Sequence, residues 1–107
     1  MFRRVFGPGC YEVGVNLAGL AGVDVARRRP AAAEAGYRRA LAIHQRLFGP
    51  RHVEVALTLN DLAMFVAARG RRAEAMRLGR RALAAFRAAC GPNHPSTRVC
   101  AANVARL

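Results

Sequence analysis

The chain repeats itself with a period of 42 residues, and this period limits the folds that are open to it. Phe6-Gly7-Pro8 recurs as Phe48-Gly49-Pro50, and the Gly-Pro pair returns at Gly91-Pro92. Residues 7–48 and 49–90 are identical at 17 of the 42 aligned positions. Such self-similarity is typical of an array of stacked units, each of which buries its apolar face against its neighbours. Arrays of this kind usually bind other proteins, so the repeat disfavours an enzyme.

Each unit is predicted to form two helices. In the second unit, apolar residues recur every three or four positions from Val55 to Val66, which indicates one face of a helix. Gly70 is expected to end that helix, because glycine adopts the left-handed conformation without steric cost. A second apolar stripe follows and ends at Gly91-Pro92. The sequence therefore predicts an all-α chain without strands, with helices over residues 10–28, 31–47, 53–69, 72–89 and 95–106.

The turns between these helices are short, so consecutive helices must pack antiparallel as hairpins. Residues on the facing stripes are expected to be buried between the helices. In the second unit these are Leu62, Ala63, Ala75, Ala82 and Leu83, and in the first unit Leu20, Ala21, Ala33, Ala40 and Leu41.

The spacing Leu59-x-x-Leu62-Ala63-x-x-Val66, followed by Gly70, Ala75 and Ala82-Leu83, resembles the tetratricopeptide repeat. The Gly91-Pro92-Asn93-His94-Pro95 run is similar to the inter-repeat signature of the 42-residue form found in kinesin light chains. The resemblance implies a right-handed α-solenoid of antiparallel helical hairpins. Its units are residues 7–48 and 49–90, with the tail of a preceding unit at 1–6 and a partial third unit at 91–107.

The phase of the repeat leaves an incomplete unit at each end, with neither end resembling a cap. Two expectations stay open. The chain is either a piece of a longer array, or a small protein whose open ends associate with another copy or a partner. In the second case Val99, Val104 and Leu107 are expected to be exposed, because an uncovered apolar end is an association site.

The resemblance also implies a function, namely a scaffold that binds a protein or peptide partner. In this family the first helix of each hairpin lines a concave groove. The corresponding groove residues are Val15, Ala18, Gly22, Val25, Leu57, Asn60, Met64 and Ala67, with Val99, Ala102 and Arg106 from the partial unit. Asn60 is either the polar anchor for an extended peptide, since its amide both donates and accepts, or simply a solvated residue.

The net charge is +12, from 18 arginines and six carboxylates, and the chain contains no lysine. Arg38-Arg39 recurs as Arg80-Arg81 and is expected to form basic rows on the convex side. Such rows offer an alternative function, binding nucleic acid or an anionic surface. An all-arginine excess is equally what a GC-rich coding sequence produces.

No catalytic or cofactor site is predicted. Gly7-Pro8-Gly9 precedes no Lys-Ser/Thr pair, and the carboxylates are scattered by the repeat. Cys10, Cys90 and Cys100 are odd in number and lack C-x-x-C spacing, so neither a zinc site nor a disulfide framework is expected. His52 and His94 occupy the same repeat position as Cys10 and are interpreted as turn residues rather than metal ligands. A membrane span and a signal peptide are also not expected, and the chain is predicted to be cytoplasmic.

Overall fold

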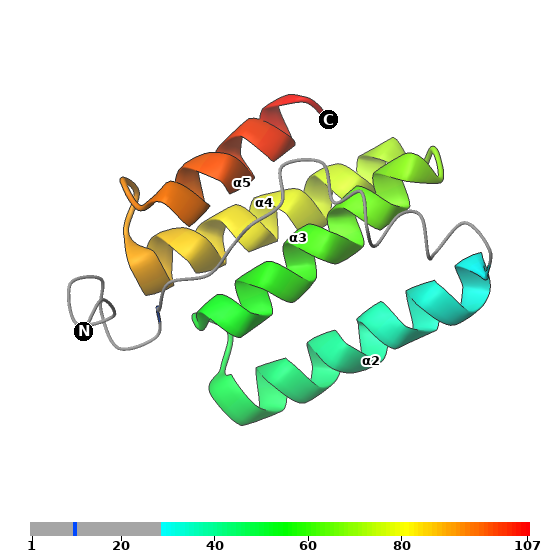
Figure 1. The fold of residues 1–107 in the computed structure, drawn as a ribbon, viewed down its shortest axis with the longest axis horizontal. Coiled ribbons are helices and arrows are strands. Elements are labelled where there is room, and N and C mark those ends of the chain that lie inside the picture. Colours follow the sequence, from blue (N-terminus) through cyan, green and yellow to red (C-terminus); the bar gives the residue numbers. More distant parts are fainter. Residues whose placement is uncertain (1–9, 11–28) are drawn as a thin grey trace.

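The structure is a computed structural model that describes residue 10 and residues 29–107. Residues 29–107 form four α-helices and contain no strand (Figure 1). The expected ranges for these four helices are confirmed to within two residues. The fifth expected helix, over 10–28, falls almost wholly outside the described residues, and Cys10 itself is not helical. The helices are α2 (Pro30–Phe48), α3 (Val53–Ala68), α4 (Arg72–Cys90) and α5 (Pro95–Ala105).

The helix starts follow from the residues at the turns. α2 begins with Pro30, whose missing N–H costs nothing in the first turn. α3 and α5 are each capped by a histidine: Nδ1 of His52 accepts from the Glu54 N–H at 3.1 Å, and Nδ1 of His94 accepts from the Ser96 N–H at 3.0 Å. The interpretation of both histidines as inter-repeat turn residues is therefore confirmed.

The helix ends lie at the glycines that the sequence marks. Gly49 and Gly91 have φ of 81° and 89°, where a side chain would be strained. Their N–H groups donate to the carbonyl oxygens of Gln45 and Arg87, so each closes the last turn of its helix. The Gly-Pro pairs therefore stand at the ends of α2 and α4, as expected.

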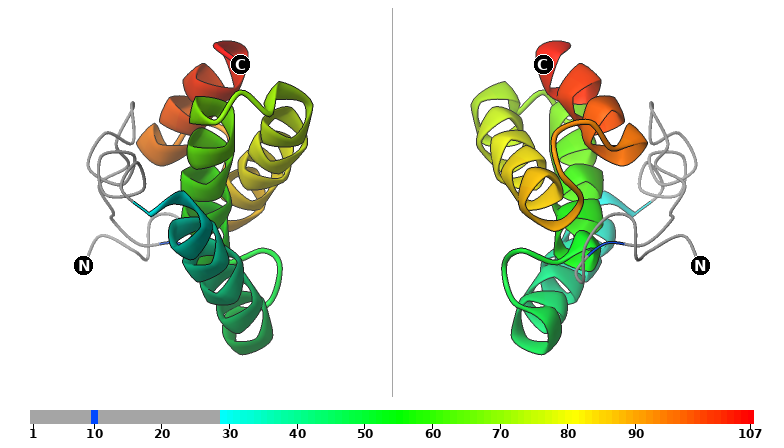
Figure 2. Two further views of the ribbon diagram at one scale, coloured as in Figure 1. Left: turned by 90° about the vertical axis from the view of Figure 1, so that its right-hand side faces the viewer. Right: turned by 90° about the vertical axis from the view of Figure 1, so that its left-hand side faces the viewer.

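The four helices pack antiparallel, with α3 at the centre (Figures 1 and 2). α3 contacts α2 on one side and α4 on the other, and α5 packs against α4. Because α3 is surrounded, most of its residues are buried, including Leu59, Leu62 and Val66. Phe86 of α4 completes the centre of the core at 0% exposure. None of the described helices combines the length and the apolar character that a membrane crossing requires.

Five of the eight expected core positions that fall in the described part of the chain are confirmed. Leu62, Ala63, Ala75 and Ala82 are fully buried, and Leu41 is 9% exposed. Leu83, by contrast, is only half-buried, as are Ala33 and Ala40. Leu83 lies at the edge of the buried stripe of α4, which is formed by Ala75, Leu78, Gly79, Ala82, Ala85, Phe86 and Ala89. Leu20 and Ala21 lie outside the described residues.

The C-terminal segment is less open than the sequence suggests. Val104 and Leu107 are half-buried and pack against the core, and Val99 is also half-buried. A Cβ added to Gly79 would lie 3.0 Å from Cγ2 of Val104 and 3.3 Å from Cδ1 of Leu107. The expectation that these three residues are uncovered is therefore wrong. Val104 and Leu107 are covered because the missing side chain of Gly79 leaves room for them against α4.

Candidate functional site

The groove residues implied by the resemblance divide into two sets. Leu57, Met64 and Ala67 lie on α3 and are half-buried. From α5, Ala102 and Arg106 are exposed. A pocket of about 460 Å³ lies where α3 and α5 end, and Ala67, Arg106 and Leu107 are among the residues that line it. The groove residues of the first unit, Val15, Ala18, Gly22 and Val25, lie outside the described residues. The described part is called the α3–α5 surface below: Leu57, Met64, Ala67, Ala102 and Arg106.

Asn60 is neither a solvated residue nor an open anchor. Its side chain is 2% exposed, and its Oδ1 accepts from Nδ2 of Asn103 at 3.3 Å. Asn103 is 1% exposed, and its own Oδ1 accepts from Arg106 at 3.1 Å. Buried amides of this kind need internal partners, because an unpaired polar group inside the protein is costly. The Asn60–Asn103 bond therefore joins α3 to α5, which orients the α3–α5 surface.

The arginines of the expected basic rows are exposed, as predicted, but they differ in whether a carboxylate binds them. Arg39, Arg80 and Arg81 have no carboxylate partner among the described residues, whereas Arg38 is fully engaged. Arg38 binds Glu34 at 2.7 Å and Glu74 at 2.6 Å. Arg71 binds the same two carboxylates, at 2.7 Å and 2.6 Å. These four residues form a closed ring of alternating charge, the ion-pair ring, which ties the N-terminal half of α2 to the start of α4.

The ion-pair ring shifts the proton affinities of its members. Hydrogen bonds from Arg71 and then Arg38 lower the pKa of Glu34 to about 2. Hydrogen bonds from Arg38 and Arg71 lower the pKa of Glu74 as well, and those from Glu34 and Glu74 raise the pKa of both arginines. The local pairs Glu34–Arg38 and Glu74–Arg71 follow from helix spacing. The two pairs that cross between helices do not, since their partners are 36 and 37 residues apart.

A cleft opens between α2 and α4 at the ends opposite the ion-pair ring. It has a volume of about 330 Å³. Its floor is apolar and its rim carries two arginines, one from the α2–α3 turn and one from α4. The α2–α4 cleft is lined chiefly by Gln45, Arg51, Val55, Leu59, Arg81 and Ala85. Sequence reasoning placed Arg81 in a basic row but gave Arg51 no role, because their proximity arises only from helix packing.

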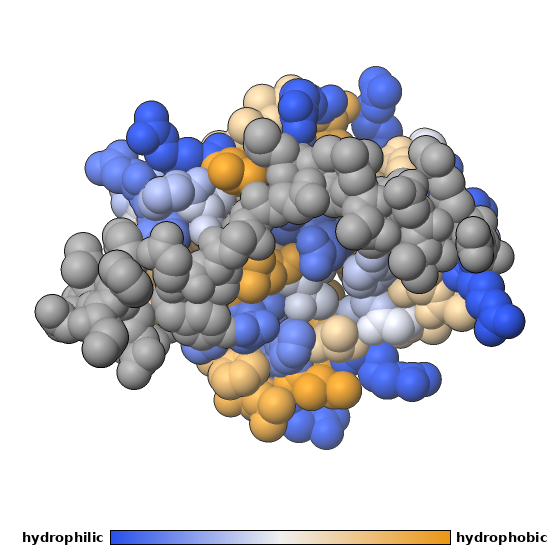
Figure 3. All heavy atoms as spheres, viewed as in Figure 1, coloured by the Kyte–Doolittle hydropathy of each residue, from blue (hydrophilic) through white to orange (hydrophobic). Residues whose placement is uncertain are grey.

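The last turns of α2 expose apolar side chains. Ile43, Leu47 and Phe48 are 47%, 67% and 45% exposed. Apolar atoms gather at the α2 edge of the face shown in Figure 3, in line with this exposure. The expectation that the chain associates with itself or a partner stays a prediction, and this end of α2 is the most apolar exposed part of the described surface.

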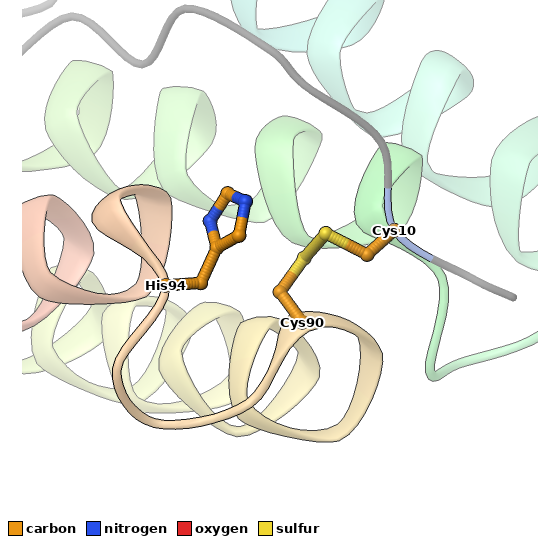
Figure 4. Close-up of side chains that lie close together, drawn as sticks. All are labelled: Cys10, Cys90 and His94. Carbon is orange, nitrogen blue, oxygen red and sulfur yellow. A yellow bond between two sulfur atoms is a disulfide. The ribbon is translucent and has the colours of Figure 1, made fainter. Parts of the chain in front are cut away.

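Two cysteines that lie far apart in the chain are bonded to one another. Cys10 and Cys90 form a disulfide across a sequence separation of 80 residues, with their Cα atoms 5.1 Å apart (Figure 4). Both are buried, at 0% and 6% exposure. The expectation that no disulfide forms is therefore wrong. Cysteine spacing could not reveal this pair, because only the folded chain brings the two residues together.

His94 completes a cluster with the disulfide. A ring nitrogen of His94 and the two sulfur atoms all lie within 4.8 Å of one another. Since Nδ1 of His94 accepts the capping bond, a neutral ring carries its proton on Nε2. Zinc would need cysteine thiolates and a ring lone pair, whereas here the sulfurs are bonded together and the Nδ1 lone pair is used. The cluster as it stands is a buried disulfide beside a capping histidine.

The third cysteine is chemically separate from this pair. Cys100 lies on α5, is fully buried and has a free thiol. Burial raises the pKa of this thiol to about 12, so it remains protonated and weakly reactive at neutral pH. Cys100 is therefore a packing residue and offers no nucleophile.

Comparison with known proteins agrees with this geometry. The tetratricopeptide repeat family model matches residues 12–88 and, one unit further on, residues 54–107. No curated protein and no solved structure matches the chain. The two overlapping matches are offset by 42 residues, which is the period of the sequence itself. The chain belongs to the tetratricopeptide repeat family.

Proposed function

We propose that this chain is a scaffold module that holds a segment of a partner protein against the α3–α5 surface. Repeats of this family generally serve as protein-interaction modules and are typically non-catalytic. The observation that carries the proposal is the pocket of about 460 Å³ where α3 and α5 end. Ala67 lines this pocket, and it shares α3 with Leu57 and Met64, half-buried apolar residues that the resemblance assigns to the groove.

The chemistry of this surface suits a short peptide segment. Met64 and Ala67 present apolar area along α3, and an unbranched methionine adapts to partners of different shape. Arg72 and Arg106 line the pocket at the end of the surface, so its rim is cationic. An acidic side chain or a chain terminus of the partner would complement that charge.

A selection experiment tests the proposal. Peptides selected from a random library on the wild-type chain should bind Ala67→Glu and Met64→Glu roughly tenfold or more weakly. Each change puts a carboxylate on apolar contact area, and at position 67 it also competes with the peptide for Arg72 and Arg106. Ala42→Glu is the matched control, since Ala42 is exposed on α2. Circular dichroism would confirm that all three variants fold. Peptides that bind Ala67→Glu and Ala42→Glu equally well would contradict the proposal.

The alternative function, nucleic-acid or anionic-surface binding through the basic rows, has less support. Arg38 already holds two carboxylates in the ion-pair ring, which also places Glu34 and Glu74 beside the row. Aromatic side chains that could stack on bases are scarce there, and Tyr37 is directed to Phe65 with ring centroids 5.6 Å apart. Steep loss of binding with rising salt would favour this alternative over peptide binding.

A further inference from the structure

The two ends of the interface between α2 and α4 differ in a way that points to a second binding site. Between the N-terminal half of α2 and the start of α4, the ion-pair ring closes the gap and neutralises its own charges. At the last turns the gap stays open as the α2–α4 cleft. The arginines at this open end, Arg51 and Arg81, have no carboxylate partner among the described residues, in contrast to Arg38 and Arg71.

The cleft combines two kinds of surface. Val55, Leu59 and Ala85 form the floor and are 1%, 2% and 5% exposed, so the bottom of the cleft is firmly packed. Arg51 and Arg81 are exposed at the rim and bring two positive charges into one cavity. A volume of about 330 Å³ falls at the lower end of the range for small ligand sites, roughly 300–1,000 Å³. Such a cavity accommodates one or two side chains rather than a long polymer.

We propose that the α2–α4 cleft binds an acidic segment of a partner protein, with a carboxylate held by Arg51 and Arg81 and an apolar side chain on the floor. Guanidinium groups bind carboxylates through paired, charge-assisted hydrogen bonds, and an anion between two arginines also relieves their mutual repulsion. The net charge of +12 steers acidic partners toward the chain. Charge complementarity and an apolar floor together select an acidic and apolar sequence.

A protein segment fits this cleft better than a nucleic-acid strand. A strand needs a continuous cationic track and aromatic platforms. The track here is interrupted by Glu34 and Glu74 at the ring end of the same interface. The apolar floor, moreover, gives no partner to phosphate or sugar. The bases of a single strand would need aromatic faces, and the residues that line the cleft include none.

This site is separate from the α3–α5 surface. Val55 and Leu57 are two positions apart on α3, which places their side chains roughly 200° apart around the helix axis. Val55 lines the α2–α4 cleft, and Leu57 belongs to the α3–α5 surface. A substitution that abolishes binding at one site should therefore leave binding at the other unchanged, and different variants test the two sites.

Counter-selection with a pair of neighbouring variants tests the inference. A random peptide library is selected on the wild-type chain after depletion on Arg81→Glu, and in parallel after depletion on Arg80→Glu. Arg80 is the matched control because it is exposed on the same helix, carries the same charge and does not line the cleft. Depletion on Arg81→Glu should leave peptides in which Asp or Glu lies next to Leu, Ile or Val. Depletion on Arg80→Glu should remove them.

The selected peptides are then synthesised with a fluorescent label and titrated against each variant. Arg51→Glu and Arg81→Glu should weaken binding by roughly tenfold or more, while Arg80→Glu changes it by less than about twofold. A peptide whose Glu is replaced by Gln should also bind the wild type more weakly, but by a smaller factor than Arg81→Glu costs the parent peptide, because Gln adds no repulsion. Equal losses in Arg80→Glu and Arg81→Glu would overturn the proposal, because they would reflect net charge alone.

Two further results would also overturn it. One is a selection in which depletion on Arg81→Glu and on Arg80→Glu leaves the same peptides. The other is full competition by a single-stranded oligonucleotide whose own binding is lost equally in both variants, which would assign the cationic surface to nucleic acid. Peptides that lose affinity in Ala67→Glu but keep it in Arg81→Glu support the proposed function alone, so the two ideas are judged separately.

Discussion

At the scale of single residues, the packing of α5 depends on the absence of a side chain at Gly79. A glycine inside a helix costs roughly 0.5–1 kcal/mol relative to alanine, so its presence in α4 needs a compensating contact. That contact is the close approach of Val104 and Leu107 to the α4 backbone. Gly79 therefore lowers the intrinsic stability of α4 but allows Val104 and Leu107 to pack against it.

Replacing Gly79 with leucine should therefore destabilise the chain by about 1–3 kcal/mol, because the new side chain occupies the space of Val104. The free energy of unfolding in urea measures this change. The same substitution in a Val104→Ala background should cost less, since the smaller residue returns part of the space. An equal cost in both backgrounds would show that Gly79 does not contact Val104.

A second residue-scale prediction concerns the histidine cap of α3. Desolvation, and then the charge of His44, lower the pKa of His52 below its usual 6.5. The pKa of His52 is therefore lower in the folded chain than in the unfolded chain. Its contribution to the free energy of unfolding is complete above pH 6.5 and is lost as the pH falls below that value. Protonation of Nδ1 also removes the acceptor for the Glu54 N–H.

The melting temperature of the wild type should therefore fall as the pH is lowered from about 7.5 to about 5.5. His52→Asn keeps a good capping residue but does not titrate, so its melting temperature should fall less over the same range. Thermal denaturation followed by circular dichroism at both pH values gives the comparison. Parallel curves for the two proteins would contradict a role for His52 in the pH response.

At the scale of elements, the ion-pair ring fixes the start of α2 against the start of α4. α2 contacts the described fold chiefly through α3, so the ring adds a second attachment for it. Exposed ion pairs contribute little individually, and a closed network with shared partners is the arrangement in which they contribute most. The side chains of Glu34 and Glu74 are 24% and 27% exposed, which reduces their screening by solvent.

Acid should weaken this attachment in a defined range. The pKa of Glu34 is lowered to about 2 from 4.5. Its contribution to the free energy of unfolding is therefore complete above pH 4.5 and is lost as the pH falls from about 4.5 to 2. Glu34→Gln should show a smaller loss of stability over that range than the wild type.

A double-mutant cycle of Glu34→Gln and Arg38→Ala should give a coupling of about 0.2–1 kcal/mol at neutral pH that decreases in high salt. Strict additivity would mean that the ring does not form in solution.

At the scale of the whole molecule, the Cys10–Cys90 disulfide closes the longest loop in the described structure. It holds residue 10 against the end of α4, whereas the side-chain hydrogen bonds between the described helices join residues at most 43 positions apart. Closing a loop of this length reduces the freedom of the unfolded chain, a contribution of about 2–4 kcal/mol.

Reduction with excess dithiothreitol should therefore lower the melting temperature of the wild type, and Cys10→Ser should show a similarly low value with or without the reductant. Cys100→Ala should respond to the reductant as the wild type does, because Cys100 is not part of the bond. Alkylation of the unreduced, denatured chain followed by mass spectrometry should label one cysteine only. Three labelled cysteines, or a melting temperature insensitive to the reductant, would contradict the disulfide.

The sequence alone determined the features that depend on neighbouring residues. The 42-residue period, the apolar stripes and the Gly-Pro pairs predicted the bounds of α2, α3, α4 and α5 to within two residues, because helix periodicity and glycine stops act over a few positions. The local pairs Glu34–Arg38 and Arg71–Glu74 belong to the same short-range class, because their partners are four and three residues apart. The repeat also identified His52 and His94 as turn residues, since both recur at the same repeat position.

Only the tertiary structure decided which faces meet. Helix periodicity specifies the direction of a side chain but not the residue that it meets on another helix. For this reason the Asn60–Asn103 bond, the Cys10–Cys90 disulfide and the crossing pairs of the ion-pair ring could not be predicted from spacing. The α2–α4 cleft belongs to the same class: Arg51 and Arg81 share a cavity because two helices held together at one end remain apart at the other.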